Sequence, residues 1–439
     1  MLSTESQSAK SIFPGGRMRA KDHFSVSAFW LGINLLWGAL LIVTIPAQMR
    51  QLAPKRPIET MDLMLGLGAL PAVVMPLIVG PLSDRCMSKL GRRRPYMLAG
   101  LAVNLVGLAM IWLAGLRLDL WLYFAGYLVV QFGNNASTGA YSGIIPDVVP
   151  LDQRGLASGW MAAMSQFGTI LGLASAGLLM RSEHVTASFA VMAASMILFC
   201  VITVLGVRER PRDVEPPPMD WLRFVKNLWI DPRKHPDFAW VWITRALVVM
   251  GLWMVQEHMQ YYLVDVMKVG EKDVPLVAAG ILVVSLICAT VTGVVGGKVS
   301  DYIGRKRVVY IANGIVALAC FAFIWAPSLG WVYAIAVLFG LGFGAYYSVD
   351  WALGCDVLPN KDDAAKDMAV WHISMVLPQS IALPLSGAIL GAWGHHYTLT
   401  ETGAKLAHYS RDGYTAMLAV AAFFLLLGAV LIRNVKGVR

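Results

Sequence analysis

Gly80-Pro-Leu-Ser-Asp84-Arg85-Cys-Met-Ser-Lys89-Leu-Gly91-Arg92-Arg93-Arg94 has a second copy later in the chain, Gly297-Lys-Val-Ser-Asp301-Tyr-Ile-Gly304-Arg305-Lys306-Arg307, with the two aspartates 217 positions apart. Another motif is repeated at a similar distance: Asp147-Val-Val-Pro150-Leu-Asp152 returns as Asp356-Val-Leu-Pro359-Asn-Lys-Asp362, 209 positions on. Both distances are close to half of the 439 residues. Two independent motifs repeated at this spacing predict one structural unit duplicated in the same orientation.

The segments between these motifs are too apolar for a water-soluble protein. Hydrophobic residues make up 57% of the chain, charged residues only 14%, and the mean hydropathy is +0.61, whereas soluble domains carry about 25% charged residues. Apolar runs of about twenty residues, enough to cross about 30 Å of hydrocarbon, follow one another. We therefore predict an all-α membrane protein with twelve transmembrane helices in two six-helix halves. The expected spans are 24–48, 61–82, 96–116, 121–145, 157–180, 186–207, 238–263, 275–297, 308–326, 330–355, 367–392 and 413–432.

The net charge of +9 is unevenly distributed over the connecting segments. Alternate segments, beginning with the N-terminal tail and ending with the C-terminal tail, hold 26 of the 36 lysines and arginines, and the other set holds 9, with Arg245 inside a span. Because basic residues gather on the cytoplasmic side of a membrane, both termini are predicted to be cytoplasmic in a multi-pass protein of the inner (plasma) membrane. The excess charge thus indicates topology, and no nucleic-acid partner is expected.

The same pattern predicts the domain organisation. We expect a cytoplasmic N-terminal tail at 1–23, an N-terminal half at 24–207, a cytoplasmic linker with an amphipathic helix at 208–237, a C-terminal half at 238–432 and a cytoplasmic tail at 433–439. Parallel halves of this kind are typical of transporters that bind their substrate near the bilayer midplane. The expected partners are a small-molecule substrate, a coupling proton or cation and membrane lipid, and the protein is expected to be a monomer.

The repeated loop motif resembles that of the major facilitator superfamily, G-x-x-x-D-R-x-G-R-[RK]. Its stretched form ending at Gly91–Pro95 is similar to the sucrose-transporter branch and its glycoside–pentoside–hexuronide cation symporter relatives. The run from Asn134 to Asp147, followed by Asp152-Gln153-Arg154, also resembles the sucrose-transporter pattern, although Ala140 and Ser142 replace a proline and an arginine. The resemblance implies alternating-access transport of a sugar coupled to a proton or cation.

Charged residues at the cytoplasmic ends of the spans are candidates for gating. Pairs between an aspartate and a basic residue are expected to form when that side closes and water is excluded. The resemblance alternatively makes Asp147 a proton-coupling residue, and the arginines of the first loop alternatively serve only to fix topology. The gating candidates are Asp84, Arg85, Arg92, Asp147, Arg154, Asp301, Arg305 and Asp356.

Charges inside the spans are costly there and therefore indicate function. Arg245 and Asp350 lie at matched depth on helices running in opposite directions, which predicts an ion pair, either permanent or opened by substrate or proton. Glu257, which precedes His258, is the best candidate for a proton carrier; its alternative is a static, hydrogen-bonded glutamate. Gly251 is a possible break between Arg245 and Glu257.

Neutral polar and aromatic residues within the spans suit a hydroxylated substrate. Amides match hydroxyl groups, and an aromatic face packs on the C–H face of a sugar; the alternatives are bonds between helices and, for tryptophan, the interfacial belt. The candidate substrate-binding residues are Asn34, Trp37, Gln131, Asn134, Asn135, Trp253, Gln256 and Trp351.

These observations predict a secondary active transporter for a small polar solute, with symport of a sugar or glycoside as the leading reading. The alternatives are a proton-driven efflux antiporter for amphiphilic compounds and a substrate sensor that has kept the fold without transport. The sequence offers no nucleophile–base pair, metal cluster or nucleotide-binding loop. No enzymatic activity, cofactor or metal site is therefore expected.

Overall fold

The structure is a computed structural model. It describes residues 18–150, 153–207, 209, 229–359, 370–371, 373–399 and 405–436. The amphipathic helix expected in the linker falls outside these residues.

Long helices form each half of the chain. The first half contains α1 (Ala20–Ala39), the π-helical segment η2 (Leu40–Thr44), α2 (Ile45–Leu52), α3 (Pro57–Asp84), α4 (Arg94–Arg117), α5 (Leu120–Tyr141), α6 (Ile144–Val148), α7 (Arg154–Arg181) and α8 (Val185–Gly206). The second half contains α10 (Pro236–Gln256), α11 (Met259–Asp265), α12 (Val274–Ile303), α13 (Arg305–Ile324), α14 (Leu329–Asp356), α16 (Gln379–Ala392), α17 (Arg411–Leu431) and the short η4 (Ile432–Asn434). Strands β1 (His395–Leu399) and β2 (Lys405–Tyr409) form an antiparallel hairpin between α16 and α17, with His395 opposite Tyr409.

Twelve helical stretches of the described chain are long enough to cross a membrane, and one of them, 373–392, contains α16 and the residues just before it. Eleven runs in the described part of the chain are both long and apolar enough. The twelfth is α5, whose 22 residues span about 33 Å at 1.5 Å per residue. Three amides, Gln131, Asn134 and Asn135, make α5 more polar than the others, and α5 packs along α4 and α3. The predicted twelve-helix architecture is thus confirmed, with α5 as its least apolar member.

Equivalent glycines bring equivalent helix pairs together in the two halves. A β-carbon on Gly133 of α5 would lie 2.4 Å from the backbone nitrogen of Asn104 on α4. Gly342 of α14 follows Gly133 by 209 positions, and its β-carbon would lie 2.8 Å from the carbonyl oxygen of Ala312 on α13. The offset is the one that separates Asp147 from Asp356, so the duplication extends into the helix packing.

Gly133→Ala is expected to destabilise the protein although alanine favours helices. The added methyl group would collide with backbone that cannot move independently, a cost of roughly 1–3 kcal/mol for overpacking. Gly159→Ala on α7 is the matched control, because nothing lies within 4 Å of its β-carbon position, and the better helix propensity of alanine stabilises it by up to about 1 kcal/mol. Thermal unfolding in detergent should show a lower Tm for the first variant and an equal or higher Tm for the second.

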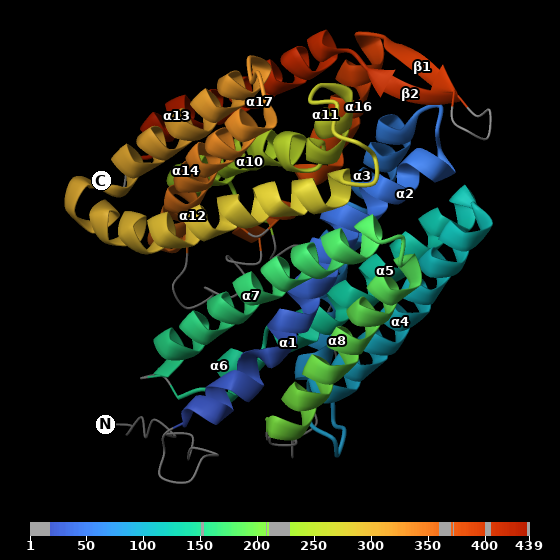
Figure 1. Ribbon diagram of the computed structural model, residues 1–439. Coiled ribbons are helices and arrows are strands. Elements are labelled where there is room, and N and C mark those ends of the chain that lie inside the picture. Colours follow the sequence, from blue (N-terminus) through green and yellow to red (C-terminus); the bar gives the residue numbers. More distant parts are fainter. Residues whose placement is uncertain are drawn as a thin grey trace, which may run out of the picture.

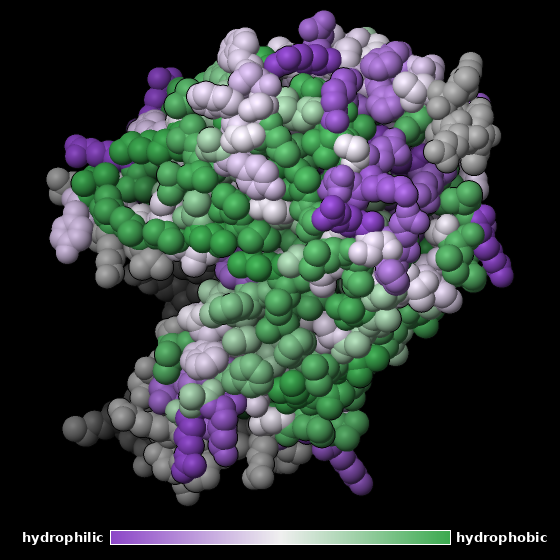
Figure 2. Space-filling model, in the orientation of Figure 1, coloured by the Kyte–Doolittle hydropathy of each residue, from purple (hydrophilic) through white to green (hydrophobic). Residues whose placement is uncertain are grey.

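The two halves converge at one end of the molecule and separate at the other. Figure 1 shows the halves side by side, with the start of α1 and the end of the chain on the left and the hairpin on the right. We call these the termini side and the hairpin side. Between the halves, α3 packs on α16 and α7 packs on α12. Figure 2 shows a notch between the halves that opens toward the termini side.

Three local features differ from the expected spans. The first helix contains the π-helical turn η2. The seventh span is broken at Glu257 and His258, between α10 and α11, and the expectation of a break at Gly251 is wrong. Gly251 remains helical and allows close packing, because its β-carbon would lie 2.7 Å from the carbonyl oxygen of Ala421 on α17. The hairpin lies between the predicted spans 367–392 and 413–432, a segment for which no strand is predicted.

Candidate transport and coupling site

A ladder of polar side chains runs along one face of α5. The amide of Asn135 donates to Gln131 Oε1 at 2.9 Å, and Gln131 Nε2 donates to the hydroxyl of Tyr127 at 2.6 Å. Each step spans four residues, the spacing that places side chains on the same helix face. Tyr127 also fits against Gly68 of α3, where no β-carbon would find room. Gln131 and Tyr127 are thereby held deep inside the first half.

The other predicted substrate-binding residues differ in burial. Asn134 is buried, while Asn34, Trp37, Asn135, Trp253 and Gln256 are half-buried, the exposure expected at the border of a cavity. Asn34 Nδ2 donates to the carbonyl of Trp30 at 2.8 Å. The side chain of Trp351 lies outside the described residues. Their role in binding substrate stays a prediction.

Arg245 and Asp350 lie together in the interior of the second half. Arg245 Nε is 2.9 Å from Asp350 Oδ2, with side chains only 2% and 5% exposed. The guanidinium carbon lies 3.3 Å from the centroid of the Trp371 ring, a cation–π arrangement. Tyr346 donates to the second aspartate oxygen at 3.1 Å. Each charge therefore has a partner in an otherwise apolar region.

A second buried polar cluster lies between the halves, near the hairpin side. Asp62 of α3 and His258 at the α10–α11 break are both fully buried, with His258 Nε2 2.9 Å from Asp62 Oδ2. The adjacent Glu257 is 2% exposed. Tyr127, at the end of the amide ladder, is near enough to Glu257 to interact electrostatically. The cluster thus connects the ladder of the first half to the broken helix of the second.

Further contacts between the halves surround this cluster on the hairpin side. They are the bonds from Gln260 Nε2 to the carbonyls of Ile42 at 2.7 Å and Val43 at 3.0 Å, from Tyr261 to the carbonyl of Pro46 at 3.2 Å, and from the amide of Ala407 in β2 to the carbonyl of Pro54 at 2.8 Å. Tyr409 donates to Glu59, and Arg50 lies 3.9 Å from Asp265. The π-helical turn η2 and the hairpin both contribute, so these unpredicted features close this side.

Two exposed ion pairs join the end of α7 to the start of α12 across the same boundary between the halves on the hairpin side, which we call the seam. Arg181 Nε lies 2.9 Å from Asp273 Oδ1, and Lys272 Nζ lies 2.8 Å from Glu183 Oε1. The hydrogen bond and charge of Lys272 lower the pKa of Glu183. Exposed pairs of this kind add little stability individually, but they mark where the halves touch.

The gating candidates form ion pairs within each half. Asp147 Oδ2 lies 2.9 Å from Arg92 Nη2 and 3.0 Å from Arg93 Nε, and Arg93 also pairs with Asp84. Gly143 allows the approach, because a β-carbon there would overlap the Arg93 guanidinium. In the second half, Arg305 Nε lies 2.7 Å from Asp356 Oδ2.

These pairs exist while the halves stand apart on the termini side, so their formation does not require closure, contrary to the sequence-based expectation. The reason is that each aspartate and its arginines belong to the same half. Arg85 takes part in further contacts, and the side chains of Arg154 and Asp301 lie outside the described residues. A gating role stays a prediction.

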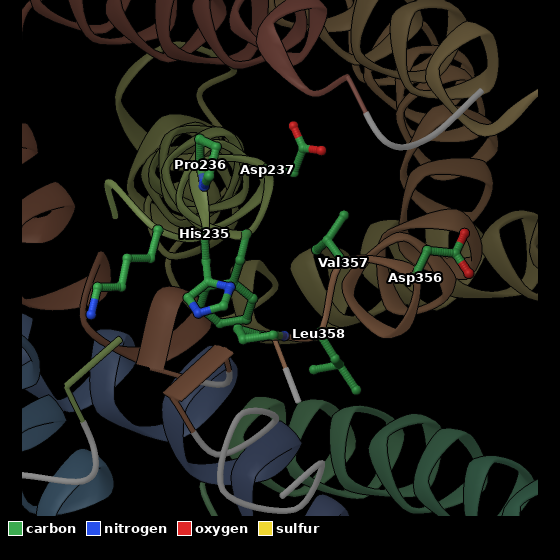
Figure 3. A pocket seen from close by; sticks show the side chains of 9 residues that line it. His235, Pro236, Asp237, Asp356, Val357 and Leu358 are labelled. Carbon is green, nitrogen blue, oxygen red and sulfur yellow. The ribbon is translucent and has the colours of Figure 1, made fainter. Parts of the chain in front are cut away.

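A hollow lies at the termini side between the start of α10 and the end of α14. Figure 3 shows the residues that line it, which are Lys234, His235, Pro236, Asp237, Phe238, Asp356, Val357, Leu358 and Pro359. The backbone amide of Lys436 donates to Asp237 Oδ1 at 2.7 Å. The hollow is thus part of the termini-side surface of the second half and lies apart from the buried charges.

Asp62 lies at the end of the predicted span 61–82 and is not among the residues predicted to form a site. The structure buries it because α11, the hairpin and the glycine face of α16 cover that end; a β-carbon on Gly387 would lie 2.9 Å from Asp62 Oδ2. The available signal is a carboxylate and a histidine near the same-side ends of two predicted spans that belong to different halves. Only the packing of the halves reveals that they meet.

Two similar six-helix bundles, joined on one side, open on the other and holding buried charges, form an architecture that is typical of membrane transporters. The family model of the Major Facilitator Superfamily matches residues 24–366, and the chain belongs to this family. It is a multi-pass membrane protein and a transporter of solutes. This confirms the resemblance seen in the loop motifs.

Individual relatives are more distant. The chain is 28% identical over 123 residues to sucrose transport protein SUC4 of Arabidopsis thaliana, a match covering 25% of this chain and 24% of the relative. Sucrose transport protein SUT1 of Oryza sativa subsp. japonica is 28% identical over 130 residues, with the same coverage. The match therefore spans about a quarter of the length of these curated relatives.

Solved structures show the same fold over nearly the whole chain. A bacterial homologue of the human lysosomal transporter Spinster, in an inward-facing and occupied conformation, superposes with a TM-score of 0.72 at 15% identity, covering 95% of this chain and 97% of that chain. The nucleoside transporter NupG superposes with a TM-score of 0.68 at 13% identity, covering 94% and 98%. At such identities the likeness extends to the fold alone.

Proposed function

We propose that this protein is a proton-coupled symporter that moves a sugar or glycoside across the plasma membrane. The observation that carries the proposal is the amide ladder of α5, whose last member, Tyr127, is near enough to Glu257 to interact electrostatically. Side-chain amides both donate to and accept from hydroxyl groups, and the half-buried Trp37 and Trp253 supply faces for a sugar ring. The curated relatives that match part of this chain are named as sucrose transport proteins.

The termini side is the cytoplasmic side in this proposal, because it carries most of the basic loop residues. The structure then represents the state that is open to the cytoplasm and closed to the outside. Glu257 is the proton carrier in the transport cycle. It lies at the helix break, where small changes in packing alter its contact with the seam and the ladder.

Uptake into liposomes reconstituted with the full chain tests the proposal. An inwardly directed proton gradient is imposed, and a panel of radiolabelled mono- and disaccharides and glycosides is offered. Accumulation that collapses with a protonophore is expected for at least one sugar, and Glu257→Gln should lose the gradient-driven part. Extrusion of amphiphilic dyes without sugar accumulation would instead indicate efflux. Sugar binding without transport would indicate a sensor.

Gln131→Leu is expected to reduce sugar uptake at least tenfold. The substitution nearly preserves volume but leaves the buried Tyr127 hydroxyl without its donor, a loss of about 1–3 kcal/mol. It also removes the side-chain acceptor of Asn135, whose amide keeps its bond to the Gln131 carbonyl at 2.8 Å. Initial uptake rates at equal amounts of reconstituted protein provide the measurement.

Asn104→Leu is the matched control for this prediction. Asn104 is a fully buried amide on the neighbouring α4, but neither of its side-chain polar atoms has a partner among the described residues. Replacing such a group with an apolar one of similar shape is neutral or stabilising, so uptake should persist. Equal loss of uptake in both variants would mean that the ladder has no special role.

A further inference from the structure

The buried cluster on the seam combines residues from both halves. Asp62 belongs to the first half, and Glu257 and His258 belong to the second; none is more than 2% exposed. His258 Nδ1 lies 2.9 Å from the carbonyl oxygen of Met254, and its Nε2 lies 2.9 Å from Asp62 Oδ2. When the halves separate on the hairpin side, Asp62 must leave the other two residues.

The hydrogen bonds fix the number of protons on the histidine–aspartate pair. A carbonyl oxygen only accepts, so His258 Nδ1 must carry a proton and donate it to Met254. The contact between Nε2 and Asp62 Oδ2 then needs another proton between the two atoms. Whichever atom holds it, the pair contains one proton more than a neutral imidazole beside an ionised carboxylate, and its net charge is zero.

Glu257 adds a second carboxyl group to this neutral pair. Its Oε2 atom is buried without a hydrogen-bond partner among the described residues. An ionised Glu257 would leave one uncompensated negative charge inside the membrane-spanning part of the protein, where such charges are costly. A protonated Glu257 keeps the whole cluster neutral.

We propose that Asp62, Glu257 and His258 form one proton-binding site shared by the two halves, which holds two protons when the hairpin side is closed. The proposal deepens the proposed function, since it rests on transport by alternating access. In water at pH above about 7, both carboxyl groups are ionised and the imidazole is mostly neutral. Closing the hairpin side therefore takes up two protons from that side, and reopening it without a release to the termini side returns them.

The charged groups around the cluster do not change the number of protons that it binds. On α3, Glu59 lies one turn before Asp62, is half-buried and accepts from Tyr409 of β2. Arg50 of α2 is matched by Asp265 of α11 at 3.9 Å and by Glu271 at 3.7 Å. The other titratable groups facing the cluster are Tyr127 of α5, Tyr261 of α11 and, beyond Asp265, His408 of β2. The described part of α16 carries no charged side chain.

Electron paramagnetic resonance distances across the hairpin side test the proposal in the full chain. Spin labels at Arg117→Cys and Pro327→Cys, both exposed and in opposite halves, report the closed and open populations in lipid nanodiscs between pH 7 and 8.5. Because the closed state holds more protons, it should lose population as pH rises. The ratio of closed to open molecules changes tenfold per pH unit for each proton. The wild-type site thus predicts about a hundredfold change per unit.

Each substitution that removes a proton-binding group should lower this pH dependence by one proton. Glu257→Gln and Asp62→Asn should each reduce it to about tenfold per pH unit, and the double variant should abolish it. His258→Gln should keep the hundredfold dependence, because two carboxyl groups must still be neutralised, with the transition moved to lower pH. Glu271→Gln is the control, a carboxylate on the same side that is 56% exposed, and should keep the hundredfold pH dependence of the wild type.

A wild-type population that does not depend on pH would overturn the proposal, as would a double variant that keeps the wild-type dependence. If Asp62→Asn fails to fold, Glu257→Gln and His258→Gln still give opposite expectations. The measurement needs no substrate. If the closed population follows the predicted pH dependence but the protein accumulates no sugar, the proton site stands and the proposed function is refuted. If uptake is proton-driven but the variants keep the wild-type pH dependence, the coupling proton binds elsewhere.

Discussion

Asp350→Asn is expected to lower the free energy of unfolding by about 3–5 kcal/mol, the cost of leaving one partner of a buried ion pair uncompensated. Arg245 would keep its charge and its contact with the Trp371 ring, but it would lose the carboxylate 2.9 Å away. Its side chain is only 2% exposed, so water cannot replace the lost partner. Chemical unfolding of the protein in mixed micelles provides the measurement.

A double-mutant cycle separates the ion pair from its surroundings. Arg245→Met should also be costly because it leaves the buried Asp350 carboxyl without its cationic partner, whereas Arg245→Met with Asp350→Asn should be much less costly than the sum of the two changes. A coupling energy near zero would contradict the prediction. The exposed pair Arg181–Asp273, with side chains 53% and 52% exposed, is the control, for which the coupling should not exceed about 1 kcal/mol.

The contact between Arg245 and Asp350 is predictable from the sequence for a simple physical reason. Helix rise is constant, so counting residues from the ends of two spans gives depth, and two opposite charges at one depth inside a bilayer must find each other or another partner. The twelve spans and the duplicated loops are predictable for a similar reason. Hydrophobic length and repeated spacing are both properties of local sequence.

Asp62 and His258 could not be paired in this way, because their contact depends on how the halves meet. Their depths are set by η2, by the break between α10 and α11 and by the hairpin, and none of these has a clear signal in the sequence. The arginine–aspartate pairs at Asp147 and Asp356 also show that contacts between the halves cannot be predicted from the sequence. Their residues were identified, but whether they join the halves or stabilise each half is a tertiary property.

Tying the halves together on the hairpin side is expected to reduce sugar uptake at least tenfold, and cleaving the tie should restore it. In the rocking mechanism that the fold supports, the substrate site opens to the hairpin side only when the contacts of that seam separate. Arg181→Cys and Asp273→Cys place thiols at an exposed contact between α7 and α12, where the present side chains approach to 2.9 Å. The native cysteines are first replaced, and a short reducible dithiol cross-linker is applied.

The loss of uptake must come from the tie and not from removal of the salt bridge, which is worth less than about 1 kcal/mol at such exposure. The uncross-linked double variant should therefore transport like the wild type. Trp112→Cys with Thr186→Cys is the matched control, since these residues form a hydrogen bond of 3.1 Å within the first half and a rigid-body motion leaves their separation unchanged. If fully cross-linked Arg181→Cys/Asp273→Cys protein still takes up sugar at the wild-type rate, the seam does not open during transport. The hairpin side would then stay closed throughout the transport cycle.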